Sequence, residues 1–286
     1  EALRLHRERN PFAAVCARVC FHVCEEKCRR ISLDSAVSIR ALKRFMVDQE
    51  IVIKLPEVRE NQENAKRKIA IIGAGPSGLT CAYFLARLGY MPTVLEGEHR
   101  PGGMLVQTIP AYRLPRETLA REIRMIENMG VDIITDKKLG RDFLIEDLRK
   151  DGYEVVFLGI GAPRGVNLNI PGSDSKDVSN AMDFLRTYNL RGSVPVKNRL
   201  VIVGGGNAAF DAARTAIRLG AQSVSIIYRR SQGEMPAYAE EVEEAIQEGI
   251  NLLPLTNPRE ILVNEKGNVT GVRCSSIRLG DFDHSG

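Results

Sequence analysis

The stretch "KIAIIGAGPSGLTCAYFLARLGYMPTVLE", residues 68–96, indicates the fold class. It opens with a short apolar run and continues through a glycine-rich turn, an amphipathic segment with helical spacing and a second apolar run. Apolar runs separated by such a segment predict a strand, a helix and a parallel strand. We therefore expect a βαβ unit of the doubly wound α/β type.

The turn in this unit, Gly73-Ala74-Gly75-Pro76-Ser77-Gly78, has the spacing of a dinucleotide-binding fingerprint. Gly73 permits the tight turn, Gly75 lets the backbone approach a pyrophosphate, and Gly78 lets the helix pack closely on the strand. Glu96 ends the second strand, where a carboxylate can accept hydrogen bonds from ribose hydroxyls. The alternative is a turn that only packs the unit together.

A glycine pair, Gly102-Gly103, follows within a few residues of Glu96. Backbone without side chains at this place can lie against the pyrophosphate or the ring of a flavin. A simple NAD-dependent dehydrogenase does not need such a loop. The pair therefore favours FAD as the ligand of the first turn.

A second unit of the same kind spans residues 199–228. Its turn, Gly204-Gly205-Gly206-Asn207-Ala208-Ala209, has the G-x-G-x-x-A form with alanine in the packing position. Where an NAD site carries an acid, this chain has Tyr228-Arg229-Arg230. Guanidinium groups bind a 2′-phosphate through charge-assisted hydrogen bonds, so we expect NADPH rather than NADH. The alternative for the two arginines is a solvated strand end.

The rest of the chain also contains segments with helical spacing and segments typical of strands. Further helices are expected at residues 1–9, 35–51, 116–130 and 239–249, and further strands at residues 131–136, 154–162 and 260–274. The polar stretch 54–68 predicts a linker. The sequence thus predicts a helical beginning followed by two nucleotide-binding domains.

Four of the six cysteines, Cys16, Cys20, Cys24 and Cys28, are spaced four residues apart. Disulfides, a zinc site, an iron–sulfur cluster and packing in a helix core are the alternatives. No secretory signal opens the chain, which favours metal ligands over disulfides. On a straight helix the four would span about 18 Å, too far for one zinc ion or one cluster. Either the helix breaks, or two clusters share the cysteines.

The charge is balanced, with 40 Lys+Arg, 36 Asp+Glu and a net charge of +4 over 286 residues. This balance gives no electrostatic footprint for nucleic acid. No apolar run approaches the eighteen or so residues of a membrane span. We expect a cytoplasmic protein of about two nucleotide-binding domains.

With these motifs, the chain resembles the small (beta) subunit of glutamate synthase. Related proteins are the N-terminal part of dihydropyrimidine dehydrogenase and the NADPH-binding subunits of bifurcating transhydrogenases. Beside the two glycine turns, the resemblance rests on "NPFAAVCARVC" (10–20), "GGMLVQTIPAYRLPRETLAREI" (102–123), "GIGAPRG" (159–165) and "YRRSQGEMPAYAEEVEEA" (228–245). It covers essentially the whole chain.

The resemblance implies a glutathione-reductase-like layout. A helical iron–sulfur domain (1–62) precedes an FAD domain (63–190), into which an NADPH domain (191–286) is inserted. Electrons pass from NADPH through FAD and [4Fe–4S] clusters to an acceptor subunit or fused domain, such as the glutamate synthase large subunit or a pyrimidine-reducing domain.

The resemblance also adds residues to the sites suggested by the motifs. It implies Met104, Leu105, Arg113 and Gly161 at FAD and Asp211 at NADPH, with Met235 and Pro236 at the edge of the NADPH site. Cys20, Cys24 and Cys28 become the preferred cluster ligands, with Cys16 after them.

Three departures from the family are visible. The family has further cluster cysteines before the position of Glu1, it carries A-T-G where this chain has Gly159-Ile160-Gly161, and it returns to the FAD domain after the position of Gly286. We therefore expect the sequence to be cut from a longer one at both ends.

Two other functions are alternatives for such a sequence. A redox-inactive dinucleotide-binding scaffold would not need both glycine turns intact. A stand-alone flavin disulfide reductase would need a cysteine pair after the first turn, where only Cys81 lies.

Overall fold

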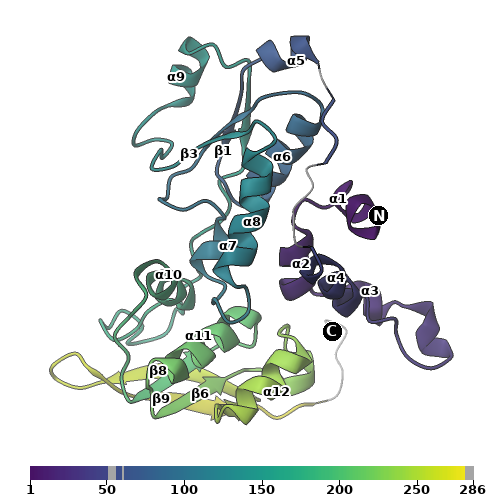
Figure 1. Ribbon diagram of the computed structural model, residues 1–286. Helices are drawn as coiled ribbons and strands as arrows, with labels where there is room; N and C mark the ends of the chain where they lie inside the picture. Colours follow the sequence, from purple (N-terminus) through teal and green to yellow (C-terminus); the bar gives the residue numbers. More distant parts are fainter. Residues whose placement is uncertain (51–55, 60, 281–286) are drawn as a thin grey trace. The chain divides into compact units, whose positions relative to one another are not determined.

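The computed structural model describes residues 1–50, 56–59 and 61–280 (Figure 1). Its contacts divide the chain into two compact units, Glu1–Ala162 and Pro163–Gly286. The three-domain boundaries at residues 62 and 190 stay a prediction. Each unit is described by itself.

The first unit contains a parallel four-stranded sheet with the strand order β3-β2-β1-β4. Its elements are β1 (Ile69–Ile72), α6 (Pro76–Arg87), β2 (Thr93–Leu95), α7 (Met104–Gln107), α8 (Arg116–Glu127), β3 (Asp132–Ile134), α9 (Ile145–Lys150) and β4 (Val155–Leu158). The predicted βαβ unit is confirmed by β1, α6 and β2. Because β2 and β4 flank β1, the strand order reverses at β1, and in such sheets ligands bind at the carboxyl ends of the strands at this point.

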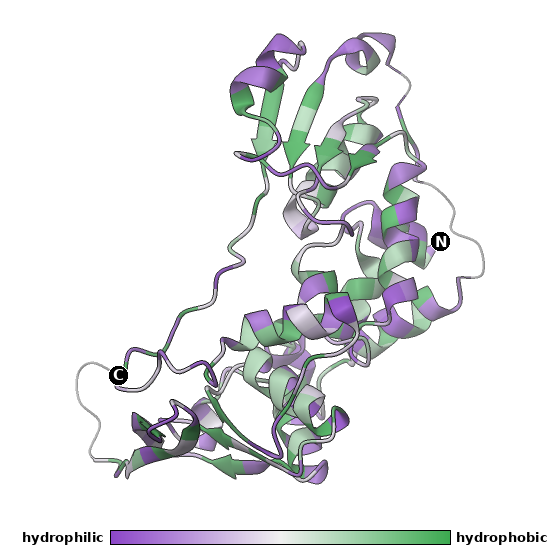
Figure 2. Cartoon of the chain, turned by 90° about the vertical axis from the view of Figure 1, so that its left-hand side faces the viewer, coloured by the Kyte–Doolittle hydropathy of each residue, from purple (hydrophilic) through white to green (hydrophobic). Residues whose placement is uncertain are grey.

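Both faces of this sheet are covered. Ile71 belongs to the main hydrophobic cluster, which also contains Leu79 of α6 and Leu119 of α8. The neighbours of Ile71 on β1, Ala70 and Ile72, belong to a second cluster with Leu148 of α9. All four residues of β1 are buried, and the strands of this sheet are largely green, that is hydrophobic, in Figure 2. This is the layered packing of a doubly wound domain.

The beginning of the chain is helical, as the sequence predicts. It contains α1 (Ala2–Arg7), α2 (Ala13–Val19), α3 (Val23–Glu26), the 3₁₀ turn η1 (Arg29–Ser32) and α4 (Ile39–Asp48). Helices α2 and α4 lie side by side and bury Ala13, Ala17 and Val47 (Figure 1). Phe12 and Val15 join the main cluster around Ile71. The helical segment therefore shares its core with the first glycine-turn domain.

The expected linker contains a short helix. Residues 54, 55 and 60 lie outside the described residues, but α5 (Gln62–Lys66) is a short helix. The Asn61 side chain caps it by accepting the N–H groups of Glu63 and Asn64. The Asn64 amide then donates to the carbonyl of Leu88 at the end of α6. Polar composition alone does not reveal these local hydrogen bonds.

The second unit contains the second predicted βαβ unit. A three-stranded parallel sheet has the order β5-β6-β7, and a hairpin pairs β8 with β9. The elements are α10 (Ala181–Arg191), β5 (Arg199–Val203), α11 (Asn207–Arg218), β6 (Ser223–Ile227), η2 (Gln232–Glu234), α12 (Ala239–Gln247), β7 (Asn251–Leu253), β8 (Thr256–Val263) and β9 (Val269–Ser276). Helix α10 and strand β7 were not predicted from the sequence. No helix among the described residues is long and apolar enough to cross a membrane.

Candidate functional site

The first glycine turn directly follows β1 and is held by close backbone contacts. Gly73 has a φ of 103°, and a Cβ atom there would lie 2.4 Å from the carbonyl oxygen of Gly159. A Cβ atom on Gly78 would lie 1.9 Å from the carbonyl oxygen of Gly73. Glycine is therefore the residue that these two positions accept, for the reasons given by the fingerprint.

Gly75 has a different environment. A Cβ atom at this position would meet only the Cα of Gly103, at 3.8 Å, among the described residues. Gly75 is the N-cap of α6, and Pro76 and Ser77, which open the helix, are exposed. Because Gly75 has no side chain, it cannot cap the first N–H groups of the helix. The amino end of α6 thus offers space and backbone donors, which fits a pyrophosphate.

Glu96 ties the turn to the end of β2. Its side chain is 7% exposed, and its Oε2 accepts the N–H of Ala74 at 2.7 Å. The other oxygen, Oε1, accepts the N–H of Glu98 at 2.9 Å. A carboxylate oxygen can accept more than one hydrogen bond, so these contacts leave capacity for ribose hydroxyls.

The glycine pair lies beside the first turn, as expected for a flavin loop. The N–H of Gly102 donates to the carbonyl of Ala74 at 2.8 Å, and Gly103 is the N-cap of α7. Helix α7 begins with Met104, which is half-buried, and Leu105, which is buried. Backbone from two separate segments therefore forms the walls of the same site.

Two other predicted FAD residues lie on different segments of the first unit. Gly161 has a φ of 67° and follows Gly159, whose N–H donates to the carbonyl of Ile72 at 2.8 Å. Arg113 is half-buried and lies between α7 and α8. The assignment of these two residues to FAD stays a prediction.

The second glycine turn follows β5. Gly204 has a φ of 141°, and a Cβ atom there would lie 3.6 Å from the Cβ of Ala209, the alanine in the packing position. Gly206 is the N-cap of α11, which begins with Asn207 and Ala208. The main features of the dinucleotide fingerprint are thus present a second time.

A segment after β6 covers this turn, and its contacts were not predicted. A Cβ atom on Gly205 would lie 2.7 Å from the ring of Tyr228. The N–H of Ala237 donates to the carbonyl of Gly205 at 3.1 Å, and the N–H of Tyr238 donates to Oδ1 of Asn207 at 3.2 Å. The sequence signal that could have indicated the contact with Gly205 was the position of Tyr228 at the end of β6.

The remaining predicted NADPH residues differ in exposure. Arg229 and Arg230 are exposed at the end of β6, so their guanidinium groups can reach a ligand phosphate. Asp211 is 4% exposed on α11, among the buried residues of that helix. The assignment of Asp211 to NADPH stays a prediction.

The cysteine segment does not form one straight helix. Helix α2 ends at Val19, Cys20 is extended with a ψ of 140°, and His22 is left-handed with a φ of 37°. Cys24 lies on the short helix α3, and Cys28 is again extended. The sequence left two possibilities, a broken helix or cysteines shared between two clusters, and the structure shows that the helix breaks.

The four thiols have two kinds of environment. Burial raises the pKa of Cys16, which packs against the main hydrophobic cluster. By contrast, hydrogen bonds from the backbone N–H groups of Val37 and Arg30 lower the pKa of Cys28. Cys24 is exposed, and Cys20 is half-buried. Thiolates are the ligands of iron–sulfur clusters, so the environment of Cys28 suits a ligand better than that of Cys16.

The cysteines do not close a metal site by themselves. Among the residues that the structure describes, no three His, Cys, Asp or Glu side chains form a group that could hold a metal ion. The chemistry of the donors fits a cluster, whereas a complete ligand set is not assembled within the described ranges.

Two known protein families match separate parts of the chain. Residues 67–278 match the family described as pyridine nucleotide-disulphide oxidoreductase, and residues 1–54 match dihydropyrimidine dehydrogenase domain II, 4Fe-4S cluster. These families imply FAD with NAD(P), and a [4Fe–4S] cluster, as cofactors.

Curated relatives align along the whole chain. The NADPH-Fe(3+) oxidoreductase subunit beta of Geobacter sulfurreducens is 41% identical over 100% of this chain and 43% of its own length. The glutamate synthase [NADPH] small chain of Escherichia coli is 33% identical over 100% of this chain and 63% of its own length. The chain therefore spans less than two thirds of the length of these relatives.

Among solved structures, FprA, an oxidoreductase of Mycobacterium tuberculosis, is similar in fold. It has a TM-score of 0.64 at 20% identity, over 77% of this chain and 66% of that chain. The resemblance to glutamate synthase small subunits is confirmed by the sequence relatives. The chain belongs to the pyridine nucleotide-disulphide oxidoreductase family.

Proposed function

We propose that this chain is the part of an electron-transfer subunit that takes electrons from NADPH through FAD to [4Fe–4S] clusters and on to a partner. The observation that carries the proposal is the pair of glycine turns, each after the first strand of its own parallel sheet. The beginning of the cysteine segment packs on the core of the first of these domains, so the proposed cluster ligands belong to the same unit as the first turn.

The first turn is the proposed FAD site. The open space at Gly75, the close approach of Gly103 and the carboxylate of Glu96 support this assignment. The residues assigned to FAD are Gly73, Gly75, Pro76, Ser77, Gly78, Glu96, Gly103, Met104, Leu105, Arg113 and Gly161. Their role is to bind the pyrophosphate and ribose and to orient the ring.

The second turn is the proposed NADPH site. The exposed Arg229 and Arg230 support a 2′-phosphate at the end of β6. The residues assigned to NADPH are Gly204, Gly205, Gly206, Asn207, Ala208, Ala209, Asp211, Arg229 and Arg230. Asp211 is buried on α11, and the other residues lie in the turn, at the start of α11 or at the end of β6.

A flavin supplies hydride acceptance from a reduced nicotinamide and one-electron release, so no side-chain acid or base is required. The protein contributes binding, orientation and the exclusion of water. Cys20, Cys24 and Cys28, with Cys16 after them, are the proposed thiolate ligands. The acceptor is a partner subunit or a fused domain, and we place the protein in the cytoplasm.

The proposal is tested with the complete protein, purified without oxygen. Its visible spectrum should contain flavin bands, and NADPH should bleach them faster than the same concentration of NADH. Gly75→Val should remove the flavin from protein that is still folded. Flavin that stays oxidised with NADPH would contradict the proposed function, and a yellow Gly75→Val protein would contradict the assignment of the first turn.

A further inference from the structure

Helix α2 connects the cysteine segment to the first glycine-turn domain. It carries Cys16, and its C-cap residue is Cys20. At its amino end, Phe12 and Val15 are buried in the same cluster as Leu119 of α8. The position of this short helix therefore determines where the cysteine segment starts relative to the domain with the first turn.

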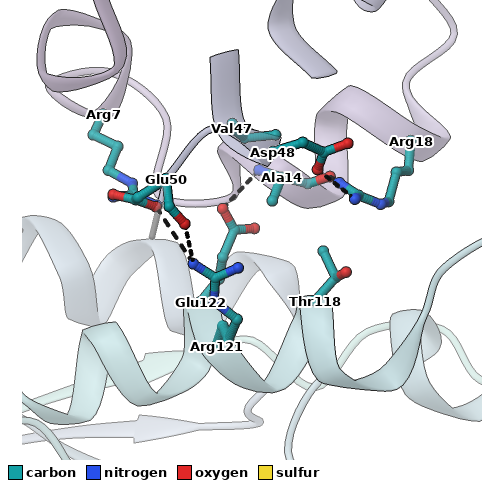
Figure 3. A pocket seen from close by; sticks show the side chains of 9 residues that line it. All are labelled: Arg7, Ala14, Arg18, Val47, Asp48, Glu50, Thr118, Arg121 and Glu122. Atoms are coloured by element: carbon teal, nitrogen blue, oxygen red, sulfur yellow. Dashed lines mark hydrogen bonds and ion pairs between the residues drawn. The ribbon is translucent and has the colours of Figure 1, made fainter. Parts of the chain in front are cut away.

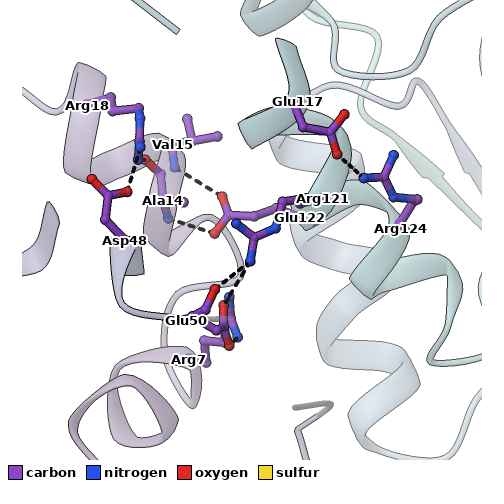
Figure 4. Close-up of polar contacts among 10 residues, drawn as sticks. All are labelled: Arg7, Ala14, Val15, Arg18, Asp48, Glu50, Glu117, Arg121, Glu122 and Arg124. Carbon is purple, nitrogen blue, oxygen red and sulfur yellow. Dashed lines mark hydrogen bonds and ion pairs between the residues drawn. The ribbon is translucent and has the colours of Figure 1, made fainter. Parts of the chain in front are cut away.

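The first N–H groups of α2 need partners from elsewhere. They have no intrahelical acceptor, and the N-cap residue, Phe12, has no polar side chain to supply one. Glu122 of α8 supplies both acceptors, as Figure 4 shows: Oε1 accepts the N–H of Ala14 at 2.6 Å and Oε2 accepts the N–H of Val15 at 3.1 Å. A carboxylate at a helix amino end also interacts favourably with the helix dipole.

Glu122 is only 1% exposed. A buried carboxylate is costly unless hydrogen bonds satisfy it, and here the donors come from a segment 108 residues away in the chain. The contact is therefore specific for one placement of α2 on α8. Apolar packing by Phe12 and Val15 alone is not directional and would tolerate small displacements.

Neighbouring ion pairs restrict the same junction. Arg7 and Glu50 form a buried pair, with side chains 5% and 9% exposed. Arg121 of α8 donates to the backbone carbonyl of Glu50 at 3.0 Å, and Arg18 pairs with Asp48 at 2.6 Å. These side chains surround a cavity of about 20 Å³ between α2, α4 and α8, which has room for one water molecule (Figure 3).

We propose that Glu122 is a positioning residue: its carboxylate fixes α2 on α8 and thereby fixes the cysteine segment relative to the FAD domain. The inference rests on the proposed function, because the distance between the flavin and the cysteine-bound centre matters only if electrons pass between them. Glu122 touches neither the reacting atoms nor, in the described contacts, a cofactor-binding residue of the first turn.

The test uses Glu122→Gln in the complete, cofactor-loaded protein at pH 8. Glutamine keeps the size, but it has one acceptor oxygen, and its NH₂ group faces a second N–H. Hydrogen exchange at the amides of Ala14 and Val15 should become faster by about tenfold, the factor expected for one lost charge-assisted hydrogen bond. Glu122→Asp, which keeps the charge but is one methylene shorter, should give a smaller change in the same direction.

The control is Glu117→Gln on the same helix. Glu117 is exposed and pairs with Arg124 within α8, away from α2 (Figure 4). The Glu117→Gln substitution removes the same charge and should leave hydrogen exchange at the amides of Ala14 and Val15 unchanged.

Stopped-flow absorbance then separates positioning from general stability. In Glu122→Gln, bleaching of the flavin by NADPH should keep the parent rate, while onward transfer to the acceptor should become slower. Unchanged amide exchange, unchanged onward transfer, or an equal loss in both phases would overturn the inference. If NADPH does not bleach the flavin of the parent protein, the proposed function is overturned instead. The exchange measurement would still test the contact between Glu122 and α2.

Discussion

Gly75 and Gly103 approach so closely that a Cβ atom on Gly103 would lie 2.8 Å from the Cα of Gly75. Gly75 lies in the turn after β1, and Gly103 is the N-cap of α7. The proposed pyrophosphate site therefore depends on a close approach of two backbones that leaves no room for a side chain on Gly103. This contact explains why the fingerprint and the later glycine pair occur together.

Gly103→Ala should weaken FAD binding. The new methyl group would overlap the turn, and Gly103 has a φ of 54°, which is unfavourable for residues other than glycine. Overlap in a tightly packed place costs about 1–3 kcal/mol, or roughly a tenfold to hundredfold loss of affinity. Flavin fluorescence released on dilution measures the change. Gly233→Ala, where the Cβ atom would meet nothing within 4 Å, is the matched control.

Gly205→Ala should act on the second turn alone. Its methyl group would lie 2.7 Å from the ring of Tyr228 and would displace the segment that covers the turn. We expect KM for NADPH to rise by about tenfold while the flavin content stays at the parent value. If Tyr228→Ala in the same chain does not relieve part of this increase, overlap with the ring is not the cause.

Arg230→Glu should shift the preference from NADPH toward NADH. Arg230 is exposed at the end of β6, and a carboxylate there would repel a 2′-phosphate. Loss of a charge-assisted hydrogen bond of about 1.5–3 kcal/mol predicts at least a tenfold fall in kcat/KM for NADPH. Arg259→Glu, which makes the same charge change at an exposed site on β8, should preserve the preference. An unchanged ratio of the two cofactors in Arg230→Glu would exclude this role.

Glu122 should titrate near neutral pH. Burial raises the pKa of Glu122 from 4.5 to about 7, and the charge of Glu50 acts in the same direction. The N–H groups of Ala14 and Val15 and the charge of Arg7 lower this pKa, but they do not offset burial. Folding thus favours the protonated form, and the carboxylate that positions α2 above about pH 7 forms at a cost in stability. The contribution to stability is complete below pH 4.5 and is lost as the pH rises through about 7. The free energy of unfolding should fall by about 3 kcal/mol across this window.

Carbon-13 NMR of protein labelled at glutamate side chains measures this pKa directly. The resonance that is missing in Glu122→Gln identifies the group. A midpoint near 4.5 would mean that the hydrogen bonds and Arg7 offset burial, and the pH dependence of stability would then lack this component.

The local patterns of the sequence were sufficient for the two βαβ units. The spacing of residues 68–96 predicts β1, α6 and β2 because apolar periodicity and glycine positions are local properties. The contact of Glu122 with Ala14 and Val15 could not be predicted, because it joins residues more than a hundred positions apart and because glutamate on an amphipathic helix normally faces water. The ring of Tyr228 over Gly205 is a tertiary contact of the same kind.

The cysteine segment was predictable in part. Its spacing excluded one straight helix around a single site, and the structure shows the break at Cys20 to His22. The unequal environments of Cys16 and Cys28 follow from packing against the core and from backbone donors, respectively, and neither is visible in the spacing.

Cys24→Ser tests whether electrons pass from NADPH through the flavin to centres bound by the cysteine segment. Cys24 is exposed on α3 and contributes nothing to the described core, so the protein should stay folded. The measurement is stopped-flow reduction of the complete, anaerobic protein by NADPH, with iron content determined on the same sample. We predict that flavin bleaching keeps its parent rate, that iron falls by at least one cluster, and that onward transfer to the acceptor is lost. Parent iron content with unchanged onward transfer in Cys24→Ser would contradict the account.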